Sequence, residues 1–88
     1  MDIIKRAFAG TMESSDVYVE VEPADGLQIQ VDSVVYAQFG DAIRETVADV
    51  LREQGVENAA VRLTDRGALE CVIRARVETA VLRGRENG

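Results

Sequence analysis

The chain has 88 residues, 47% of them hydrophobic, with 16 acidic and 10 basic side chains and a formal net charge of −6. A chain of this length forms one domain with one modest core and little room for a deep pocket. The surplus of acid disfavours nucleic-acid binding, because phosphate contacts need an excess of Lys and Arg. The absence of His and of a glycine-rich phosphate loop leaves little catalytic chemistry and favours a binding or carrying role.

The sequence predicts a soluble, cytoplasmic protein. The first residues place an acid before the basic pair and contain no long apolar run, unlike a secretory signal peptide. No stretch approaches the ~18 apolar residues of a membrane span. The single Cys71 cannot form a disulfide within the chain, which fits a reducing compartment.

Two segments alternate apolar and polar residues with the period of a half-buried strand, residues 17–22 and residues 27–32. Between them, Pro23-Ala24-Asp25-Gly26 has turn chemistry, because proline fixes φ and Gly26 permits a positive φ. We therefore expect these two segments to form a β-hairpin with one aliphatic face.

A helix is predicted next, over about residues 35–54. Ser33 is a candidate N-cap, and Gly55 is a candidate C-terminal cap residue. The apolar stripe of this helix steps by four or three residues through Val35, Phe39, Ile43, Val47 and Val50.

Residues 58–64, which follow the helix, are predicted to form a third strand.

Residues 69–81 admit two interpretations. Spacings of three and four predict a second helix, supported by Glu70 and Arg74 as an i,i+4 pair. The same residues also alternate, so a turn at Asp65-Arg66-Gly67 could instead lead into a fourth strand at about 68–76. We favour the helix, because Ala, Leu, Arg and Glu dominate the segment.

These elements predict an α+β fold, a two-layer ββαβα arrangement in which both helices cover one face of a three-stranded antiparallel sheet. A right-handed crossover would place the first strand between the other two, in spatial order 2-1-3. The alternative keeps a fourth strand at about 68–76 and a short C-terminal helix. We expect one domain over 1–88, with residues 1–15 as an N-terminal segment and a frayed tail at 84–88.

Three groups of residues invite a chemical role. Ser14 and Ser15 lie in a polar segment, Gly10 to Asp16, that is an ordinary turn or the site of a covalent modification. Asp41, Glu45 and Asp49 share one helix face, where acid–base chemistry, metal binding and a solvated or docking surface are alternatives. We expect Cys71 to be a small buried hydrophobe rather than an acyl-carrying thiol.

Three blocks together resemble the acyl carrier protein (gamma) subunit of citrate lyase. They are Gly10-Thr11-Met12-Glu13-Ser14-Ser15-Asp16, Gln38-Phe39-Gly40-Asp41-Ala42-Ile43-Arg44 and the segment from Asp65 to Arg76. The resemblance implies that Ser14, directly after Glu13, is joined by a phosphodiester to 2′-(5″-phosphoribosyl)-3′-dephospho-CoA, while Ser15 occupies a variable position. Glu13 and Asp16 would orient that serine or contact the modifying enzyme.

The same resemblance implies a non-catalytic carrier with no metal site and no catalytic residue of its own. Its arm would present acetyl and citryl thioesters to a transferase (alpha) subunit and a lyase (beta) subunit, which cleave citrate to oxaloacetate and acetate. A prosthetic-group transferase and an acetylating ligase are further implied partners. The alternatives are the carrier of a malonate decarboxylase-like complex and an unmodified interaction module. The Arg-rich C-terminal third is a solvated face or meets phosphates or a partner.

Overall fold

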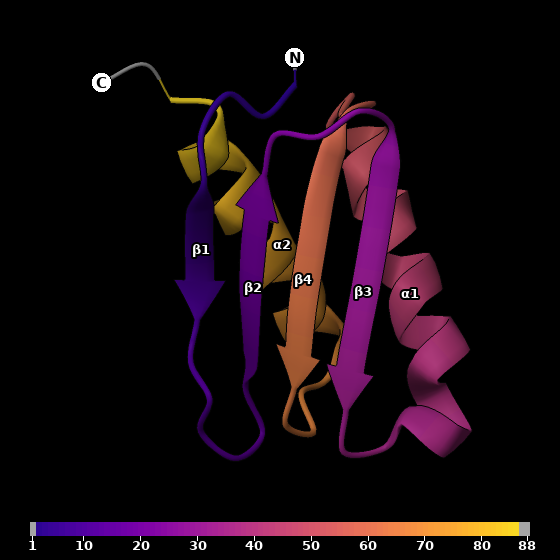
Figure 1. The fold of residues 1–88 in the computed structure, drawn as a ribbon. Helices are drawn as coiled ribbons and strands as arrows, with labels where there is room; N and C mark the ends of the chain where they lie inside the picture. The colour runs from indigo at the N-terminus through magenta and orange to yellow at the C-terminus, as the bar shows by residue number, and fades with distance from the viewer. Residues whose placement is uncertain (1, 87–88) are drawn as a thin grey trace.

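A computed structural model describes residues 2–86 of the chain. Both helices lie on one face of a four-stranded sheet, and the other face of the sheet carries no helix (Figure 1). The elements in chain order are β1 (Ala7–Gly10), β2 (Val17–Glu22), β3 (Leu27–Ser33), α1 (Tyr36–Glu53), β4 (Ala59–Asp65) and α2 (Glu70–Gly84). The expected α+β class, with two helices on one face of a sheet, is confirmed.

The sheet has the order β1-β2-β4-β3, so the predicted three-stranded antiparallel sheet in order 2-1-3 is wrong. β1 pairs with β2, and β2 with β4, in antiparallel fashion, whereas β3 runs parallel to β4. The predicted hairpin of residues 17–22 with 27–32 does not form, because β4 lies between these strands. β3, α1 and β4 instead make a β-α-β unit of two adjacent parallel strands.

The missing strand is β1, and it explains the error in strand order. It is only four residues long, AFAG, so its alternation of buried and exposed residues is too short to stand out in the sequence. Pairing with β1 occupies one edge of β2 and leaves the other edge to β4. The alternative fourth strand at 68–76 is also wrong, because α2 begins at Glu70 and continues through that segment.

The burial of side chains agrees with the strand order β1-β2-β4-β3. The inward side chains of β2 are fully buried: Val17, Val19 and Val21. β3 lies at the sheet edge, where Ile29 and Val31 are only partly buried against the core and the alternate side chains are polar and exposed. Polar side chains on an edge strand discourage pairing with a further strand from another chain.

The two helices close the core from one side of the sheet. On α1 the predicted stripe is buried at Ile43, Val47 and Val50, but Phe39 near its N-terminal end is 53% exposed. Helix α1 begins at Tyr36 without a side-chain cap, so Ser33 is not its N-cap. The Ser33 hydroxyl instead accepts the Val35 N–H at 3.1 Å and donates to the buried Asp65 at 2.8 Å.

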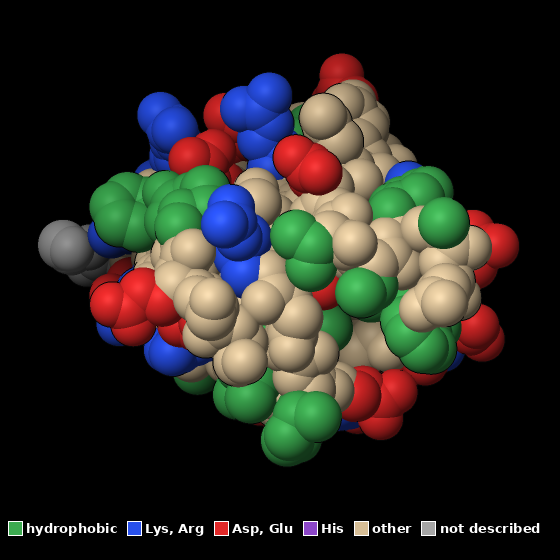
Figure 2. Space-filling model, turned by 90° about the horizontal axis from the view of Figure 1, so that it is seen from below, with side chains coloured by type: hydrophobic (Ala, Val, Ile, Leu, Met, Phe, Trp, Pro, Cys, Tyr) green, Lys and Arg blue, Asp and Glu red, His purple; other side chains and the backbone are tan. Residues whose placement is uncertain are grey.

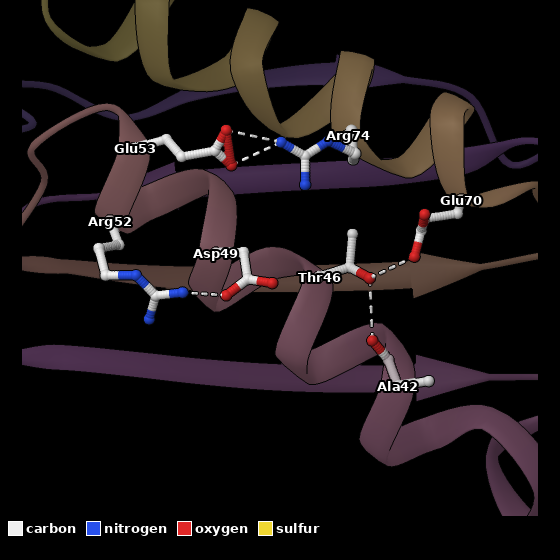
Figure 3. Close-up of polar contacts among 7 residues, drawn as sticks. All are labelled: Ala42, Thr46, Asp49, Arg52, Glu53, Glu70 and Arg74. Atoms are coloured by element: carbon white, nitrogen blue, oxygen red, sulfur yellow. Dashed lines mark hydrogen bonds and ion pairs between the residues drawn. The ribbon is translucent and has the colours of Figure 1, made fainter.

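Polar contacts fasten the helices to each other (Figure 3). Arg74 on α2 reaches across to the Glu53 carboxylate on α1, at 2.9 Å to Oε1, rather than pairing with Glu70 as predicted. Glu70 accepts a long hydrogen bond, 3.4 Å, from the hydroxyl of Thr46. These bonds cross between elements, which a count of helical spacings within α2 does not reveal.

The two described ends of the chain meet. The N–H groups of Ile4 and Lys5 both donate to the Gly84 carbonyl oxygen, at 2.9 and 3.1 Å, and Ile3 is buried. Gly84 is buried and Arg85 donates to the Gln54 carbonyl oxygen at 3.0 Å, while Glu86 is exposed. A frayed tail over residues 84–88 stays a prediction. The rest of that predicted tail, residues 87–88, lies outside the described residues. Within residues 2–86, neither helix is long and apolar enough to cross a membrane.

Candidate functional site

Ser14 lies in the loop that joins β1 to β2, here called the serine loop, residues 11–16. The loop is at the lower end of the sheet in Figure 1. Ser14 is exposed, and its hydroxyl makes no hydrogen bond to any residue that the structure describes. The hydroxyl is therefore accessible to a reagent or an enzyme.

Gly10 is required where the chain enters the loop. Its φ is +90°, a conformation that strongly favours glycine, and a Cβ placed there would lie 1.8 Å from the Val17 carbonyl oxygen. The backbone of the loop entrance and exit therefore pass in direct contact. Gly10 therefore has a packing role in the structure.

Asp16 organises the loop. Its carboxylate accepts the Thr11 hydroxyl at 2.6 Å, the Val17 N–H at 2.7 Å, and the guanidinium of Arg76 from α2 at 3.1 and 3.2 Å. The Thr11 hydroxyl bond, followed by the Val17 N–H and the Arg76 charge, lowers the pKa of Asp16 from its ordinary 3.8 to about 2. Asp16 therefore holds the loop in shape rather than being a free acid beside the serine.

Ser15 ties the serine loop to the turn between β4 and α2. Its N–H donates to the Arg66 carbonyl oxygen at 2.8 Å, and the Arg66 N–H donates to the Asp16 carbonyl oxygen at 2.9 Å. Ser15 has a φ of +66°, unlike every other non-glycine residue that the structure describes. The strain fits a residue whose backbone is fixed by its neighbours. Ser14 is thus displayed on a loop held from two sides.

An apolar surface lies at the same end of the sheet as the serine loop (Figure 1). A cleft of about 320 Å³ lies between the start of α1 and the turn after β4, lined by Val35, Phe39, Ala68, Leu69 and Ile73 among others. Phe39 is 53% and Leu69 71% exposed, and the view from below shows hydrophobic side chains spread over this end of the molecule (Figure 2). The serine end therefore combines a reactive hydroxyl with exposed apolar groups.

The other candidates do not assemble into a reactive site. Asp49 forms an ion pair with Arg52, while Asp41 and Glu45 are exposed on α1. Among residues 2–86, no three His, Cys, Asp or Glu side chains are grouped so as to hold a metal ion. Cys71 is exposed on α2, which corrects the expectation that it is buried. The expectation rests on its place beside Val72 and Ile73 in a stretch that supplies core residues, and the helix turns Ile73 inward and Cys71 outward.

Sequence reasoning missed two residues of the site. The sequence places Arg76 in the predicted second helix and in the Arg-rich C-terminal third, but it does not show that the Arg76 guanidinium reaches Asp16, 60 residues away in the sequence. Arg66 was read as part of a turn, and its backbone pairing with Ser15 and Asp16 has no local signal. A contact between distant segments becomes visible only when β2 and β4 are known to be neighbours.

The residues present fit a covalently attached group. The Ser14 hydroxyl faces solvent, the neighbouring carboxylate of Asp16 is committed to the loop, and cations are carried on both segments that hold the loop, at Arg66 and Arg76. A phosphate ester on Ser14 would lie on the loop that these two arginines flank, and guanidinium groups bind phosphate well.

The sequence is similar to known carrier proteins over almost its whole length. The family described as malonate decarboxylase delta subunit (MdcD) matches residues 4–84. Citrate lyase acyl carrier proteins of Escherichia fergusonii and Pectobacterium atrosepticum are 51% and 52% identical, covering 98% and 94% of this chain and 91% and 88% of theirs. A chain of the Pseudomonas malonate decarboxylase hetero-tetramer, solved with malonate, is 26% identical with a TM-score of 0.71, covering 86% of this chain and 79% of that one.

Proposed function

The chain belongs to the citrate lyase acyl carrier protein family, and from this membership we propose that it is the acyl carrier subunit of a citrate lyase. Ser14 is the proposed attachment point of 2′-(5″-phosphoribosyl)-3′-dephospho-CoA. The observation that supports it best is an exposed, unbonded serine hydroxyl on a loop that is fixed on both sides. Attachment forms a bond from the Ser14 hydroxyl oxygen to the phosphorus of a phosphoanhydride-activated coenzyme donor. The phosphoanhydride bond breaks, the polyphosphate leaving group departs, and the hydroxyl proton is released, which gives a phosphodiester.

The residues of the serine loop prepare this attachment. Gly10 and Asp16 hold the backbone so that Ser14 is presented to a modifying enzyme without prior ordering of a flexible segment. Preorganisation of this kind lowers the entropy cost of docking. Thr11 and Arg76 occupy the Asp16 carboxylate, which keeps it from acting as a base at the serine.

The attached arm would supply a terminal thiol that carries acetyl and citryl groups between the transferase (alpha) and lyase (beta) subunits. For this chain, tethering at Ser14 means that both partner active sites are served from one fixed point at a high effective concentration. The exposed apolar side chains of Phe39 and Leu69, at the same end of the sheet as the serine loop, suit transient contacts with those subunits. A soluble, cytoplasmic location is part of the same proposal.

A malonate decarboxylase carrier is the second candidate. It is favoured by the family that matches residues 4–84 and by the likeness to a chain of the Pseudomonas malonate decarboxylase. The citrate lyase assignment is preferred because the relatives with that name are about twice as similar, at 51% and 52% identity against 26%. Reconstitution with each set of partner subunits separates the two candidates.

The test is the intact mass of the protein after incubation with the prosthetic-group transferase and its coenzyme donor. We expect a single increment on the natural sequence, none on Ser14→Ala, and an unchanged increment on Ser15→Ala and Cys71→Ser. The modified chain should then support citrate cleavage only with its alpha and beta subunits. An increment that persists in Ser14→Ala, or oxaloacetate formed by the chain alone, would overturn the proposal.

A further inference from the structure

The arginines of this chain are almost all committed to contacts within the molecule. Of the nine, seven donate to a carboxylate or a carbonyl oxygen within residues 2–86: Arg6, Arg44, Arg52, Arg74, Arg76, Arg83 and Arg85. Arg62 and Arg66 have exposed side chains without such a contact in the part of the chain that the structure describes. The question of which arginine is available to a ligand therefore reduces to these two.

Their positions differ sharply. Arg62 lies in the middle of β4, in register with Glu20 on one side and Gln30 on the other, on the face without helices. Arg66 lies just beyond the end of β4, and its backbone makes two hydrogen bonds to Ser15 and Asp16, the residues that follow Ser14. Its Cα is therefore held beside the serine loop, whichever rotamer the exposed side chain adopts.

Charge supplies the reason for a cation here. A phosphodiester on Ser14 adds a negative charge between the carboxylates of Glu13 and Asp16. Arg76 already neutralises Asp16 and contacts both of its carboxylate oxygens. The charge of the phosphodiester and the charges of the neighbouring carboxylates destabilise one another, because they have the same sign. A second guanidinium would offset this repulsion.

We infer that the guanidinium of Arg66 binds the phosphodiester formed on Ser14 and so fixes the origin of the arm against the β4–α2 turn. The inference rests on the proposed function, since it needs the modified serine. Arg66 is a positioning residue in this role: it contacts the attachment phosphate and leaves the thiol end of the arm free.

The test compares melting temperatures of unmodified and modified protein in four variants at low ionic strength. These are the natural sequence, Arg66→Gln, Arg66→Lys and, as a matched control from the preceding strand β4, Arg62→Gln. We expect modification to shift the melting temperature of Arg66→Gln downward by roughly 1–5 °C relative to its shift in the natural sequence. Arg66→Lys should keep most of the natural value, and Arg62→Gln all of it.

Two further readouts sharpen the result. The ³¹P resonance of the phosphodiester should move in Arg66→Gln but not in Arg62→Gln. Raising the salt to about 1 M, where screening acts over ~3 Å, should remove the difference in melting temperature.

The outcomes separate this inference from the proposed function. Absence of any mass increment on the natural sequence would overturn both. A normal increment with equal melting shifts and ³¹P resonances in all four variants would overturn the role of Arg66 alone. Equal losses in Arg66→Gln and Arg62→Gln would show an effect of net charge, and would also overturn it.

Discussion

The loops at the two ends of β2 both contain an aspartate and have a glycine in or beside them, but they connect their strands differently. The serine loop, residues 11–16, follows Gly10 and joins two neighbouring antiparallel strands. The β2–β3 loop, residues 23–26, ends at Gly26 and joins strands that β4 separates. The β2–β3 loop, although richer in turn residues, therefore does not form a hairpin, whereas the serine loop does. A turn sequence permits a change of direction, and which strands become neighbours is decided by the rest of the sheet.

Each loop is also held by an aspartate, at opposite ends of the sheet. Asp16 binds Thr11, Val17 and Arg76 at the serine end. At the other end, Asp2 accepts the N–H groups of Glu57 and Asn58 at 2.8 and 3.1 Å. Asn58 in turn accepts the Gly26 N–H at 2.8 Å. The serine loop has a cation in its network, and the network of the β2–β3 loop consists of amide and carboxylate groups.

The largest expected effect is a difference in stability between alanine substitutions at Gly10 and at Gly26. Gly10→Ala should lower the free energy of unfolding by about 3–5 kcal/mol, because it combines a positive φ with a Cβ that overlaps the Val17 carbonyl oxygen. Gly26→Ala should cost only about 1–2 kcal/mol, since its φ is +75° but no atom lies within 4 Å of the added Cβ. Urea unfolding measures both. Equal losses would mean that the serine loop is not more tightly built.

The next effect is the response of the two aspartates to acid. The pKa of Asp16 is lowered to about 2, so its stabilising contribution is complete above its ordinary 3.8 and is lost as the pH falls toward 2. Asp16→Asn should therefore unfold with a flatter dependence on pH between about 4 and 2. The pKa of Asp2 is also lowered, first by its bond from the Asn58 side chain and then by the Glu57 N–H.

Asp2→Asn is the matched control, and it should flatten the acid response in the same direction but to a smaller extent, since no guanidinium contacts Asp2. Thermal melts from pH 5 to 2 measure both variants. If the melting temperature of Asp16→Asn depends on pH as steeply as that of the natural sequence, Asp16 does not stabilise the serine loop.

The smallest effect concerns the two adjacent serines. Ser15→Gly should raise the free energy of unfolding by up to about 1 kcal/mol, because glycine relieves the cost of a φ of +66°. Ser14 does not have a positive φ, so Ser14→Gly should lower the free energy of unfolding by about 0.5–1 kcal/mol. Chemical denaturation resolves the sign. The same sign for both substitutions would contradict the assignment of strain to Ser15 alone.

Much of the local structure was predictable from the sequence. Val17, Val19 and Val21 alternate over a full strand, and the residues of α1 keep a helical stripe over 18 residues, so both patterns are long enough to be decisive. The choice of helix for residues 70–84 was also correct, because Ile73, Val77 and Ala80 turn inward together. The family was identified from its three sequence blocks.

What could not be predicted depends on contacts between distant segments. The alternating pattern of β1 is only four residues long, so β1 is missed in the sequence. Without β1, one edge of β2 is left unpaired, and the sequence assigns β3 to that edge. The parallel pairing of β3 with β4 leaves no trace in either strand alone. At the site, Ser14 could be singled out by its motif, while Arg66 and Arg76 reach the loop only through the folded sheet and helix.

The junction between the two described ends of the chain has a practical consequence. Because Ile4 and Lys5 are bonded to Gly84, the first and last described segments leave the domain together, at the end of the sheet opposite the serine loop (Figure 1). A fluorescent reporter, an affinity tag or an immobilising linker joined at either terminus would thus orient the molecule in one sense, with Ser14 directed away from the support. The protein immobilised in this way would expose the serine loop to molecules in solution.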